Sequence, residues 1–434
     1  MMRNLLCRPS RPFEPREYEK MYGKKYFAFR GLSMDQQMVF WDSCRALLLS
    51  RGYHLYKPAS GPCHEYISVP TLPSFSGPVQ YPYAYREANA LIDSPRDPFM
   101  GACNRSMVFY AQDSEGRHVV LKHVCGNSQE YRILRFLQSQ GFQAMEENCI
   151  MPVLELIEHK ENWLVVMPRW GSASRNPPLH RVEDILHYML CLLKALIYLH
   201  ANSIVHRDIT LLNSLVNHIE AHPSRAAAAI GYRQGLREHG LIKYAMFDFD
   251  LSIHMPENVR LLPASYTWIT VGPWPHDAAQ GEYMYDPFAY DVALLGIVFC
   301  LEFQHLTKYI PMLAPLFDSM VTDDISRRFT AAQALEFLSD NWKEFISSSQ
   351  SLPYDLEWEG MSWDEYDRWA GLPDDFVRKW GYLREPSPTK MTRFLRWSCD
   401  SYRIYRTVAW LRRSIDKMRQ KDSREMESYR AIPL

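Results

Sequence analysis

The order of hydrophobic and polar positions divides the chain into a strand-rich stretch followed by a helical one. Short runs rich in β-branched and aromatic residues predict strands at 107–111, 118–122 and 163–167. Apolar residues recurring every three or four positions predict helices at 128–138 and 182–201. We therefore expect an α+β protein with two lobes, a small β-rich lobe followed by a larger α-helical lobe.

Two extensions flank these lobes in the expected organisation. The N-terminal extension holds one helix, because Ser33 and Gln36 form a capping-box pattern and Gly52 suits a helix C-terminus. A Pro-rich stretch follows it, and we expect this stretch to run extended. The predicted boundaries are 1–94 for the N-terminal extension, 95–170 for the β-rich lobe, 171–346 for the helical lobe and 347–434 for a C-terminal tail.

The C-terminal tail has two contrasting parts. Residues 352–375 are acidic and rich in Trp, whereas residues 390–421 are basic, with apolar residues at helical spacing. A basic amphipathic helix can bind a membrane surface or an acidic partner. The expectation for this helix is intramolecular packing, against the acidic segment or the helical lobe.

Overall charge and cysteine usage narrow the classes of function. The net charge of -1 gives no reason to expect binding to nucleic acid. The nine cysteines are scattered without a CxxC spacing, which argues against a disulfide framework and a zinc site. Because there is no signal-peptide pattern and no apolar run near the ~18 residues of a membrane span, we expect a cytoplasmic or nuclear protein without a transmembrane segment.

The strongest chemical signal follows the predicted helix 182–201. There the chain reads His206-Arg207-Asp208 and, five residues after the aspartate, Asn213. Phosphoryl transfer needs a carboxylate beside the attacking hydroxyl and an oxygen ligand for Mg²⁺, and this spacing supplies both. A second carboxylate, Asp248, ends an apolar strand in the segment 244–250 and is a further candidate metal ligand.

A lysine and a glutamate complete the candidate site. Lys122 ends the strand sequence Val119-Val120-Leu121-Lys122, and Glu130 lies eight residues farther on, at the start of the predicted helix. A strand lysine paired with a helix glutamate can hold the α- and β-phosphates of ATP. Each residue alone has an ordinary structural explanation, but the ordered series favours one nucleotide site.

On these motifs, residues 95–346 resemble the eukaryotic protein kinase superfamily, in particular its divergent members of the basidiomycete type. The resemblance implies ATP and Mg²⁺ as cofactors, with catalytic roles for Asp208, Lys122, Glu130 and Arg207 and metal ligation by Asn213 and Asp248. It places the nucleotide against Val108, the gatekeeper Met167 and the hinge residues Arg169 and Trp170. It also implies that Asp291 supports the catalytic loop and that Arg328 pairs with a glutamate of an APE motif.

The chain departs from the kinase pattern in several places. The three glycine positions of the phosphate-binding loop fall on Gly101, Cys103 and Ser106, so only the first is kept. Asp250 replaces the glycine of the DFG motif, as a further metal ligand or, as we expect, as part of a turn.

Other departures affect the substrate side. Thr210 replaces a lysine that contacts phosphate, and no APE motif is evident, which leaves Asp277 or Glu282 as partners for Arg328. An insertion at 218–239 is expected to be a surface insertion, with partner binding as the alternative.

Three functions are compatible with these motifs. The favoured one is an active Ser/Thr protein kinase, because every charged residue needed for transfer is present. A pseudokinase, meaning a nucleotide-binding or inactive interaction module, accounts better for the eroded loop. A small-molecule kinase of the choline or aminoglycoside kind shares part of the motif and is the third alternative.

Overall fold

The computed structural model describes residues 34–58, 67–86, 101–102, 107–173, 179, 181–219, 226–269, 274–347, 352 and 362–430. Its contacts divide the chain into two compact units. Unit 1 comprises 1–13, 205–210 and 255–434, and unit 2 comprises 14–204 and 211–254. The predicted lobe boundary at residue 170 lies inside unit 2. The protein is a mixed α+β structure with a main antiparallel sheet.

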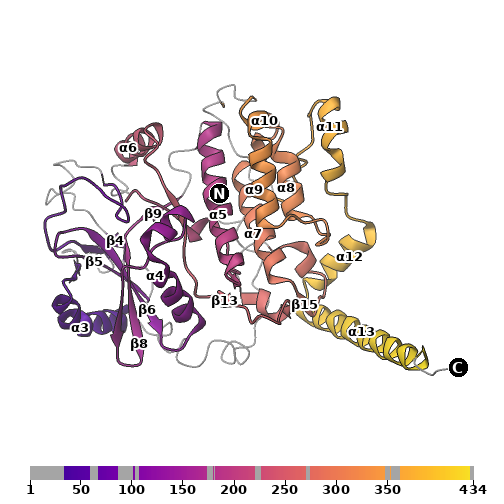
Figure 1. The fold of residues 1–434 in the computed structure, drawn as a ribbon, viewed down its shortest axis with the longest axis horizontal. Helices are drawn as coiled ribbons and strands as arrows, with labels where there is room; N and C mark the ends of the chain where they lie inside the picture. The colour runs from indigo at the N-terminus through magenta and orange to yellow at the C-terminus, as the bar shows by residue number, and fades with distance from the viewer. Residues whose placement is uncertain are drawn as a thin grey trace. The chain divides into compact units, whose positions relative to one another are not determined.

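Unit 2 is built on a five-stranded antiparallel sheet with the order β1-β5-β6-β8-β7. Strands β5, β6 and β8 of this sheet are labelled in Figure 1. The predicted strands are confirmed with small shifts at their ends. The strands are β1 His54–Leu55, β5 Val108–Gln112, β6 His118–Cys125, β7 Glu155–His159 and β8 Asn162–Pro168. Two smaller sheets accompany it, one formed by β2 Lys57–Pro58, β3 Ile67–Val69 and β4 Gly101–Ala102, the other by β9 Gly171–Ser172, β11 Ser214–Val216 and β12 Tyr244–Met246.

One face of the large sheet packs against the N-terminal extension. Helix α3 (Met34–Ser50) buries Trp41, Cys44 and Leu48 against Phe109 and Leu121 of the sheet. The helix ends as predicted, since Gly52 has a φ of 83°, which glycine adopts without strain. The N-terminal extension therefore contributes to the core of unit 2.

Helices α4 and α5 complete the frame of unit 2. Helix α4 (Gln129–Glu147) is longer than predicted and changes direction at Gly141, whose φ of 82° and ψ of 167° are not helical. Helix α5 (Val182–Ala201) has the predicted bounds and is buried along most of its length. Strand β10 (Ile204–Val205) and strand β13 (Ile253–His254) lie where the chain passes between the units.

The predicted surface insertion contains a helix with a buried side. Helix α6 (Ala226–Glu238) places Arg233 at 2% exposure, and its Nε donates to Nδ1 of His218 at 3.0 Å. The other guanidinium nitrogen donates to the Ser172 carbonyl oxygen at 3.4 Å. These contacts fasten the described part of the insertion to the β9–β11–β12 sheet.

Unit 1 is mainly helical. Its central helix α7 (Pro287–Phe303) starts with an Asp286 cap and a proline in the first turn, both favourable at a helix N-terminus. Gly296 lies so close to α8 (Leu313–Val321) that an added Cβ would come within 2.8 Å of Met320. The remaining elements of this unit are β14 Leu262–Pro263, β15 Met284–Tyr285, α9 Ala331–Asp340, α10 Trp342–Ser347, α11 Asp374–Trp380, α12 Lys390–Cys399 and α13 Tyr402–Arg430, with 3₁₀ segments at 264–269, 276–278, 304–306 and 381–383. A further 3₁₀ turn, at 211–213, belongs to unit 2.

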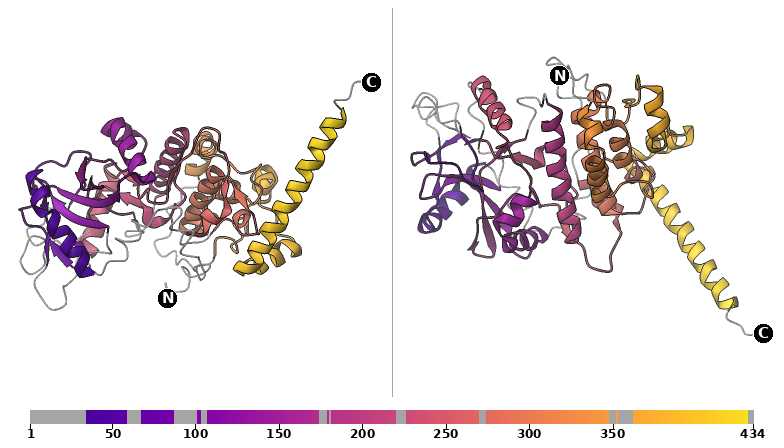
Figure 2. Two further views of the ribbon diagram at one scale, coloured as in Figure 1. Left: turned by 90° about the horizontal axis from the view of Figure 1, so that it is seen from below. Right: turned by 45° about the horizontal axis from the view of Figure 1, so that its top comes forward.

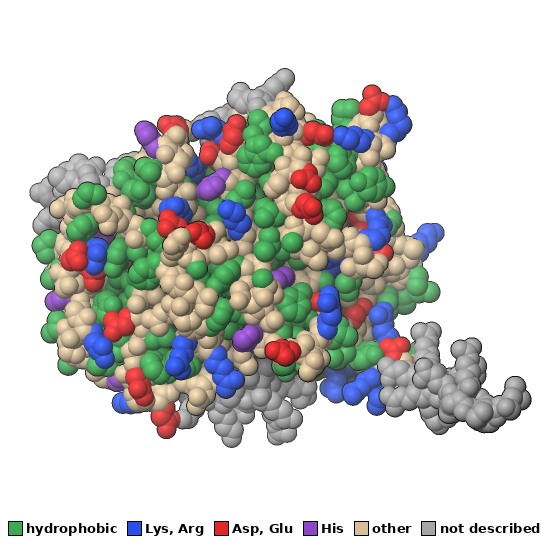
Figure 3. Space-filling view, in the orientation of Figure 1, with side chains coloured by type: hydrophobic (Ala, Val, Ile, Leu, Met, Phe, Trp, Pro, Cys, Tyr) green, Lys and Arg blue, Asp and Glu red, His purple; other side chains and the backbone are tan. Residues whose placement is uncertain are grey.

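Helix α7 and the turn after it are the only described segment long and apolar enough to cross a membrane. Within Pro287–Leu306, 83% of the apolar window is buried in the protein, as in the core helix of a globular domain. Basic and acidic side chains are interspersed over the described part of the face shown in Figure 3, in keeping with the small net charge.

Helix α13 extends beyond the other helices of unit 1 (Figures 1 and 2). Its first half packs on the segment before α7, where the Tyr405 hydroxyl donates to the Glu282 carbonyl oxygen at 2.7 Å. Arg412 lies 3.1 Å from the Glu282 carboxylate, and Tyr283 donates to Asp416 at 2.8 Å. The predicted intramolecular packing of the basic helix is therefore observed, on residues 282–283 of the helical region.

Candidate functional site

Three charged residues predicted from separate motifs meet in unit 2. The Lys122 ammonium on β6 lies 2.5 Å from Oε1 of Glu130 and 2.5 Å from Oδ1 of Asp248. The Lys122 and Glu130 side chains are nearly buried, whereas the Asp248 side chain is 30% exposed. The cluster thus has a buried end and an accessible carboxylate.

Local structure explains where each member lies. Ser128 caps α4 by accepting from the Tyr131 amide, and this sets Glu130 in the first helical turn, where a negative charge is favourable. Asp248 follows β12 and has a φ of 69°, a left-handed conformation that non-glycine residues rarely adopt. Such a conformation costs free energy and is concentrated at functional sites.

Burial and the charges of neighbouring residues have opposite effects on the pKa values of Lys122 and Glu130. Burial lowers the pKa of Lys122, but the carboxylates of Asp248, Glu130 and Asp250 raise it by more, so the pKa lies above its ordinary value. Burial raises the pKa of Glu130 to about 7, and the neighbouring Lys122 only partly offsets it. Lys122 is therefore a firmly charged cation, and it holds Glu130 and Asp248 together.

The two candidate metal ligands lie at the same end of a strand pair. Ser214 of β11 is opposite Met246 of β12, and the Phe247 amide donates to the Asn213 carbonyl oxygen at 3.2 Å. Asn213 and Asp248 are the residues just beyond these positions, and both offer oxygen ligands of the kind Mg²⁺ takes. Among the residues that the structure describes, no group of three or more His, Cys, Asp or Glu is arranged to hold a metal ion.

Asp250 lies in a turn, as expected, and also adds charge to the cluster. The turn is closed by the Ser252 amide, which donates to the Phe249 carbonyl oxygen at 3.1 Å. The Asp250 carboxylate raises the pKa values of both Lys122 and Glu130. The sequence places an aspartate at position 250, but it does not show that the Asp250 carboxylate lies close enough to act on Lys122.

Residues expected to meet the nucleotide share one face of the large sheet. Val108 is directly opposite Lys122, and Met167 is opposite Val120, two positions before Lys122. Residues directly opposite in an antiparallel pair, and residues two apart in a strand, point to the same side. The face that carries Lys122 is thus the reverse of the one packed on α3.

The two residues expected at the hinge, Arg169 and Trp170, contact the N-terminal extension. The Arg169 guanidinium donates to the Tyr56 hydroxyl at 3.0 Å and lies over the Tyr110 ring at 4.1 Å. The Trp170 indole donates to the Pro82 carbonyl oxygen at 2.8 Å. No sequence signal points to Tyr56 or Pro82, because they lie more than eighty positions before their partners.

The phosphate-loop prediction is only partly within the described structure. Gly101 belongs to β4, which pairs with β3, where Gly101 is opposite Ser68. Cys103 and Ser106 lie outside the described residues. In the described chain, β4 is therefore an edge of the small β2–β3–β4 sheet, separate from the sheet that carries Lys122.

The His206-Arg207-Asp208 segment belongs to unit 1 and is fixed by the predicted helix aspartate. Fully buried Asp291 accepts from the His206 amide at 2.7 Å and from the Arg207 amide at 2.6 Å. Arg207 has a φ of 69°, and its buried guanidinium donates to the Tyr266 carbonyl oxygen at 2.6 Å and the Tyr285 hydroxyl at 3.1 Å. The structure thus holds the backbone before Asp208 in one conformation.

Of the two acidic residues that the sequence left as candidate partners for Arg328, the structure pairs it with Asp277. The two side chains form an ion pair at 2.5 Å, with the Arg328 side chain 1% exposed. The same guanidinium donates to the carbonyl oxygens of Thr322 and Ala289. The other candidate, Glu282, pairs instead with Arg412 of α13.

No protein-family model matches the chain, and a search of curated proteins found no match.

Proposed function

We propose that this protein has a bilobal protein-kinase-like fold and catalyses ATP- and Mg²⁺-dependent phosphoryl transfer to Ser or Thr of protein substrates. The observation that carries the proposal is the Lys122 ammonium between Glu130 and Asp248, at 2.5 Å from each. These residues come from a strand, a helix and a strand end that are distant in the sequence. Their convergence is what a nucleotide triphosphate site of this kind requires.

Each residue has a role that its chemistry supports. Lys122 would bind the α- and β-phosphates, with Glu130 holding the ammonium in place. Asn213 and Asp248 would ligate Mg²⁺, which neutralises charge on the phosphate oxygens. Asp208 would accept the proton that the substrate hydroxyl donates, and Arg207 would brace this loop through its buried contacts.

The Arg328–Asp277 pair favours a protein substrate over a small molecule. By the kinase resemblance, the late arginine anchors the segment that docks a substrate peptide. Arg328 and Asp277 would form this anchor, with a buried guanidinium and an aspartate in place of the glutamate. Buried ion pairs of this kind fix one arrangement of a segment.

A nucleotide-binding protein without transfer activity is the second candidate. It is favoured by the pairing of β4 with β3, which places Gly101 in the small β2–β3–β4 sheet. Asp250 adds a carboxylate near Lys122, which increases the negative charge that a triphosphate would meet. Both features weaken phosphate binding without removing Lys122 or Asp248.

Two measurements on the purified full chain separate the candidates. With Mg²⁺ and γ-labelled ATP, the proposal expects transfer to a mixed protein substrate and a loss of roughly 100-fold or more in Asp208→Asn. The same variant should keep the rise in melting temperature caused by ATP and Mg²⁺. A thermal shift with equal, negligible transfer in both proteins would identify the second candidate, and the absence of both signals would refute nucleotide binding.

A further inference from the structure

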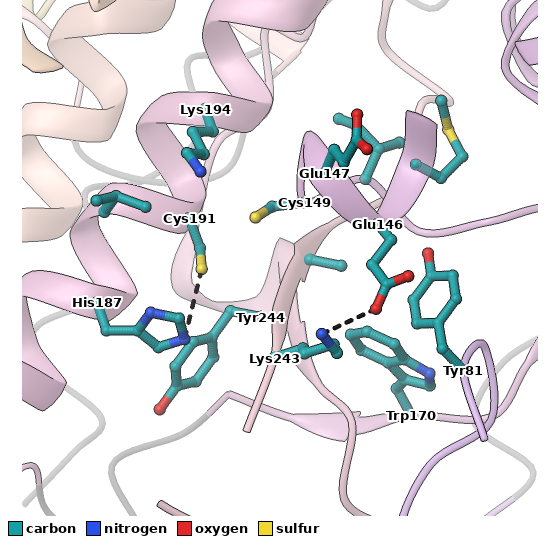
Figure 4. A pocket seen from close by; sticks show the side chains of 14 residues that line it. Tyr81, Glu146, Glu147, Cys149, Trp170, His187, Cys191, Lys194, Lys243 and Tyr244 are labelled. Carbon is teal, nitrogen blue, oxygen red and sulfur yellow. Dashed lines mark hydrogen bonds and ion pairs between the residues drawn. The ribbon is translucent and has the colours of Figure 1, made fainter. Parts of the chain in front are cut away.

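A second polar cluster lies in a cavity of unit 2 (Figure 4). The expected hinge residue Trp170 is part of its lining, whereas Lys122, Glu130, Asn213 and Asp248 are not. The cavity has a volume of about 310 Å³ and lies between the C-terminal end of α4, the middle of α5 and strand β12. Cys149 and Cys191 both line it, with His187, Lys194 and Lys243 around them. Figure 4 shows both sulfur atoms and the Lys194 ammonium turned toward the same space.

Hydrogen bonds in the cavity give the two thiols different roles. His187 Nε2 lies 3.2 Å from the Ile242 carbonyl oxygen, which can only accept, so Nε2 carries the hydrogen. The same nitrogen lies 3.8 Å from Cys191 Sγ, which therefore accepts from the imidazole. The S–H of Cys191 can therefore point to the Cys149 sulfur, which lines the same cavity, and this arrangement favours the negative charge of the pair on Cys149.

The lysines around the two cysteines also favour the thiolate form of Cys149. The hydrogen bond from Cys191 lowers the pKa of Cys149, burial opposes this, and Lys194 and Lys243 lower it further. The same hydrogen bond, together with burial, raises the pKa of Cys191. The other titratable groups lining the cavity are Tyr81, Glu146, Glu147, His187 and Tyr244, and Glu146 pairs with Lys243 at 2.8 Å.

The backbone holds the acidic thiol in place and leaves it accessible. Cys149 has a φ of 53°, and its carbonyl oxygen accepts from the Met246 amide at 2.9 Å. Its side chain is partly exposed, whereas Cys191 is buried at 3% exposure. A partly exposed thiol whose pKa is lowered by nearby lysines is the reactive kind of cysteine.

We propose that Cys149 and Cys191 form a redox site, in which Cys149 reacts with a hydroperoxide and Cys191 closes a disulfide with it. The Cys149 thiolate attacks a peroxide oxygen, the O–O bond breaks, and the leaving oxygen departs as water or an alcohol after taking a proton. Cys149 is oxidised to the sulfenic acid while the peroxide is reduced. The Cys191 sulfur then attacks the Cys149 sulfur, the S–O bond breaks, and the released hydroxide takes the Cys191 proton to form water.

Closing this bond would tie the segment after α4 to α5. Cys149 lies two positions beyond the last residue of α4, the helix that carries Glu130 at its other end. A thiol of a separate reductant would reverse the step by exchange. The reaction at Cys149 does not depend on phosphoryl transfer, so it is tested separately.

Alkylation of the full-length protein tests the reactivity of Cys149. With substoichiometric iodoacetamide at pH 7, peptide mass spectrometry should find Cys149 modified roughly tenfold faster than the partly exposed Cys125. Lys194→Met should slow the modification of Cys149 and leave that of Cys125 unchanged. Equal rates at the two cysteines in the wild type would overturn the assignment of Cys149 as the reactive thiol.

Oxidation tests the pairing. After hydrogen peroxide and without reductant, the wild type should yield a Cys149–Cys191 linked peptide, whereas Cys191→Ser should stop at a dimedone-reactive Cys149. The disulfide is mapped in the wild-type protein, so the test can be carried out even if the Cys191→Ser variant does not fold. A wild-type protein in which Cys149 stays reduced, or pairs with another cysteine, would refute the proposal.

Discussion

At the scale of single residues, Lys122 is the most constrained side chain of the candidate site. Its ammonium is enclosed by the carboxylates of Glu130, Asp248 and Asp250, which raise its pKa against the effect of burial. A buried ion pair contributes little net stability, but removing one partner leaves an uncompensated charge. Replacing Lys122 should therefore affect the stability of the fold as well as the proposed chemistry.

We predict that Lys122→Met abolishes phosphoryl transfer, with a loss of roughly 100-fold or more, and lowers the free energy of unfolding by about 2 kcal/mol. The destabilisation arises because Glu130 loses its cation. Adding Glu130→Gln to this variant should recover part of the stability and none of the activity. Chemical unfolding followed by circular dichroism, together with the transfer assay, measures both quantities. An active Lys122→Met protein would contradict the assigned role.

At the scale of elements, α13 is docked through a small set of contacts with the segment before α7. Val408 packs on Gly281, whose φ of +81° and lack of a Cβ let the helix approach. Arg412 and the Tyr405 hydroxyl hold the side chain and the backbone of Glu282. The docking of α13 and the position of Glu282 are therefore coupled.

Burial raises the pKa of Glu282 to about 7, from an ordinary value of 4.5, although Gln280 and Arg412 partly oppose the rise. Between these two pH values the folded protein holds a proton that the unfolded chain releases. Stability therefore falls as pH rises through this window, and it is level on either side of it. Relative to Glu282→Gln, we predict a loss of about 2 kcal/mol between pH 4.5 and 7.

Melting temperatures of both proteins across pH 4 to 8.5 check this dependence. Arg412→Met serves as a second comparison, because removing the cation should move the upper end of the window to higher pH. A constant difference between the wild type and Glu282→Gln over the whole range would show that Glu282 does not titrate as described.

At the scale of the whole molecule, part of the predicted tail belongs to the core of unit 1. The buried Asp318 of α8 accepts from Arg368 at 2.6 Å and from the Trp369 indole at 2.8 Å. Trp369 and Leu372 also pack on Ala314 of the same helix. The chain after residue 346 thus supplies partners for a buried carboxylate.

A chain ending at residue 346 should accordingly be less stable than the full protein by about 3–5 kcal/mol or fail to fold, because Asp318 is left buried without its cation. A chain ending at residue 389 keeps Arg368 and Trp369 and should fold, although it lacks α12 and α13. Soluble yield and melting temperature compare the two. Asp318→Asn should partly rescue the shorter chain, and equal stability of both truncations would contradict the core assignment.

Local structure was largely predictable from the sequence. The strands around Lys122, the helix at 182–201 and the helix end at Gly52 follow from periodicity and caps, which act over a few neighbouring residues. The motif spacings likewise identified Lys122, Glu130 and Asp248, which meet in unit 2. The kinase resemblance pointed to Asp291, which binds the backbone at His206. These identities depend on chemistry that each residue carries by itself.

Tertiary structure alone decided which distant groups became partners. The sequence left Asp277 and Glu282 open for Arg328, and it contained no sign that Cys149 and Cys191 share a cavity or that Arg368 reaches Asp318. Such pairings depend on burial and on the approach of side chains separated by tens of residues. Local sequence preferences cannot predict these pairs, because each pair gains its free energy only after the core around it has formed.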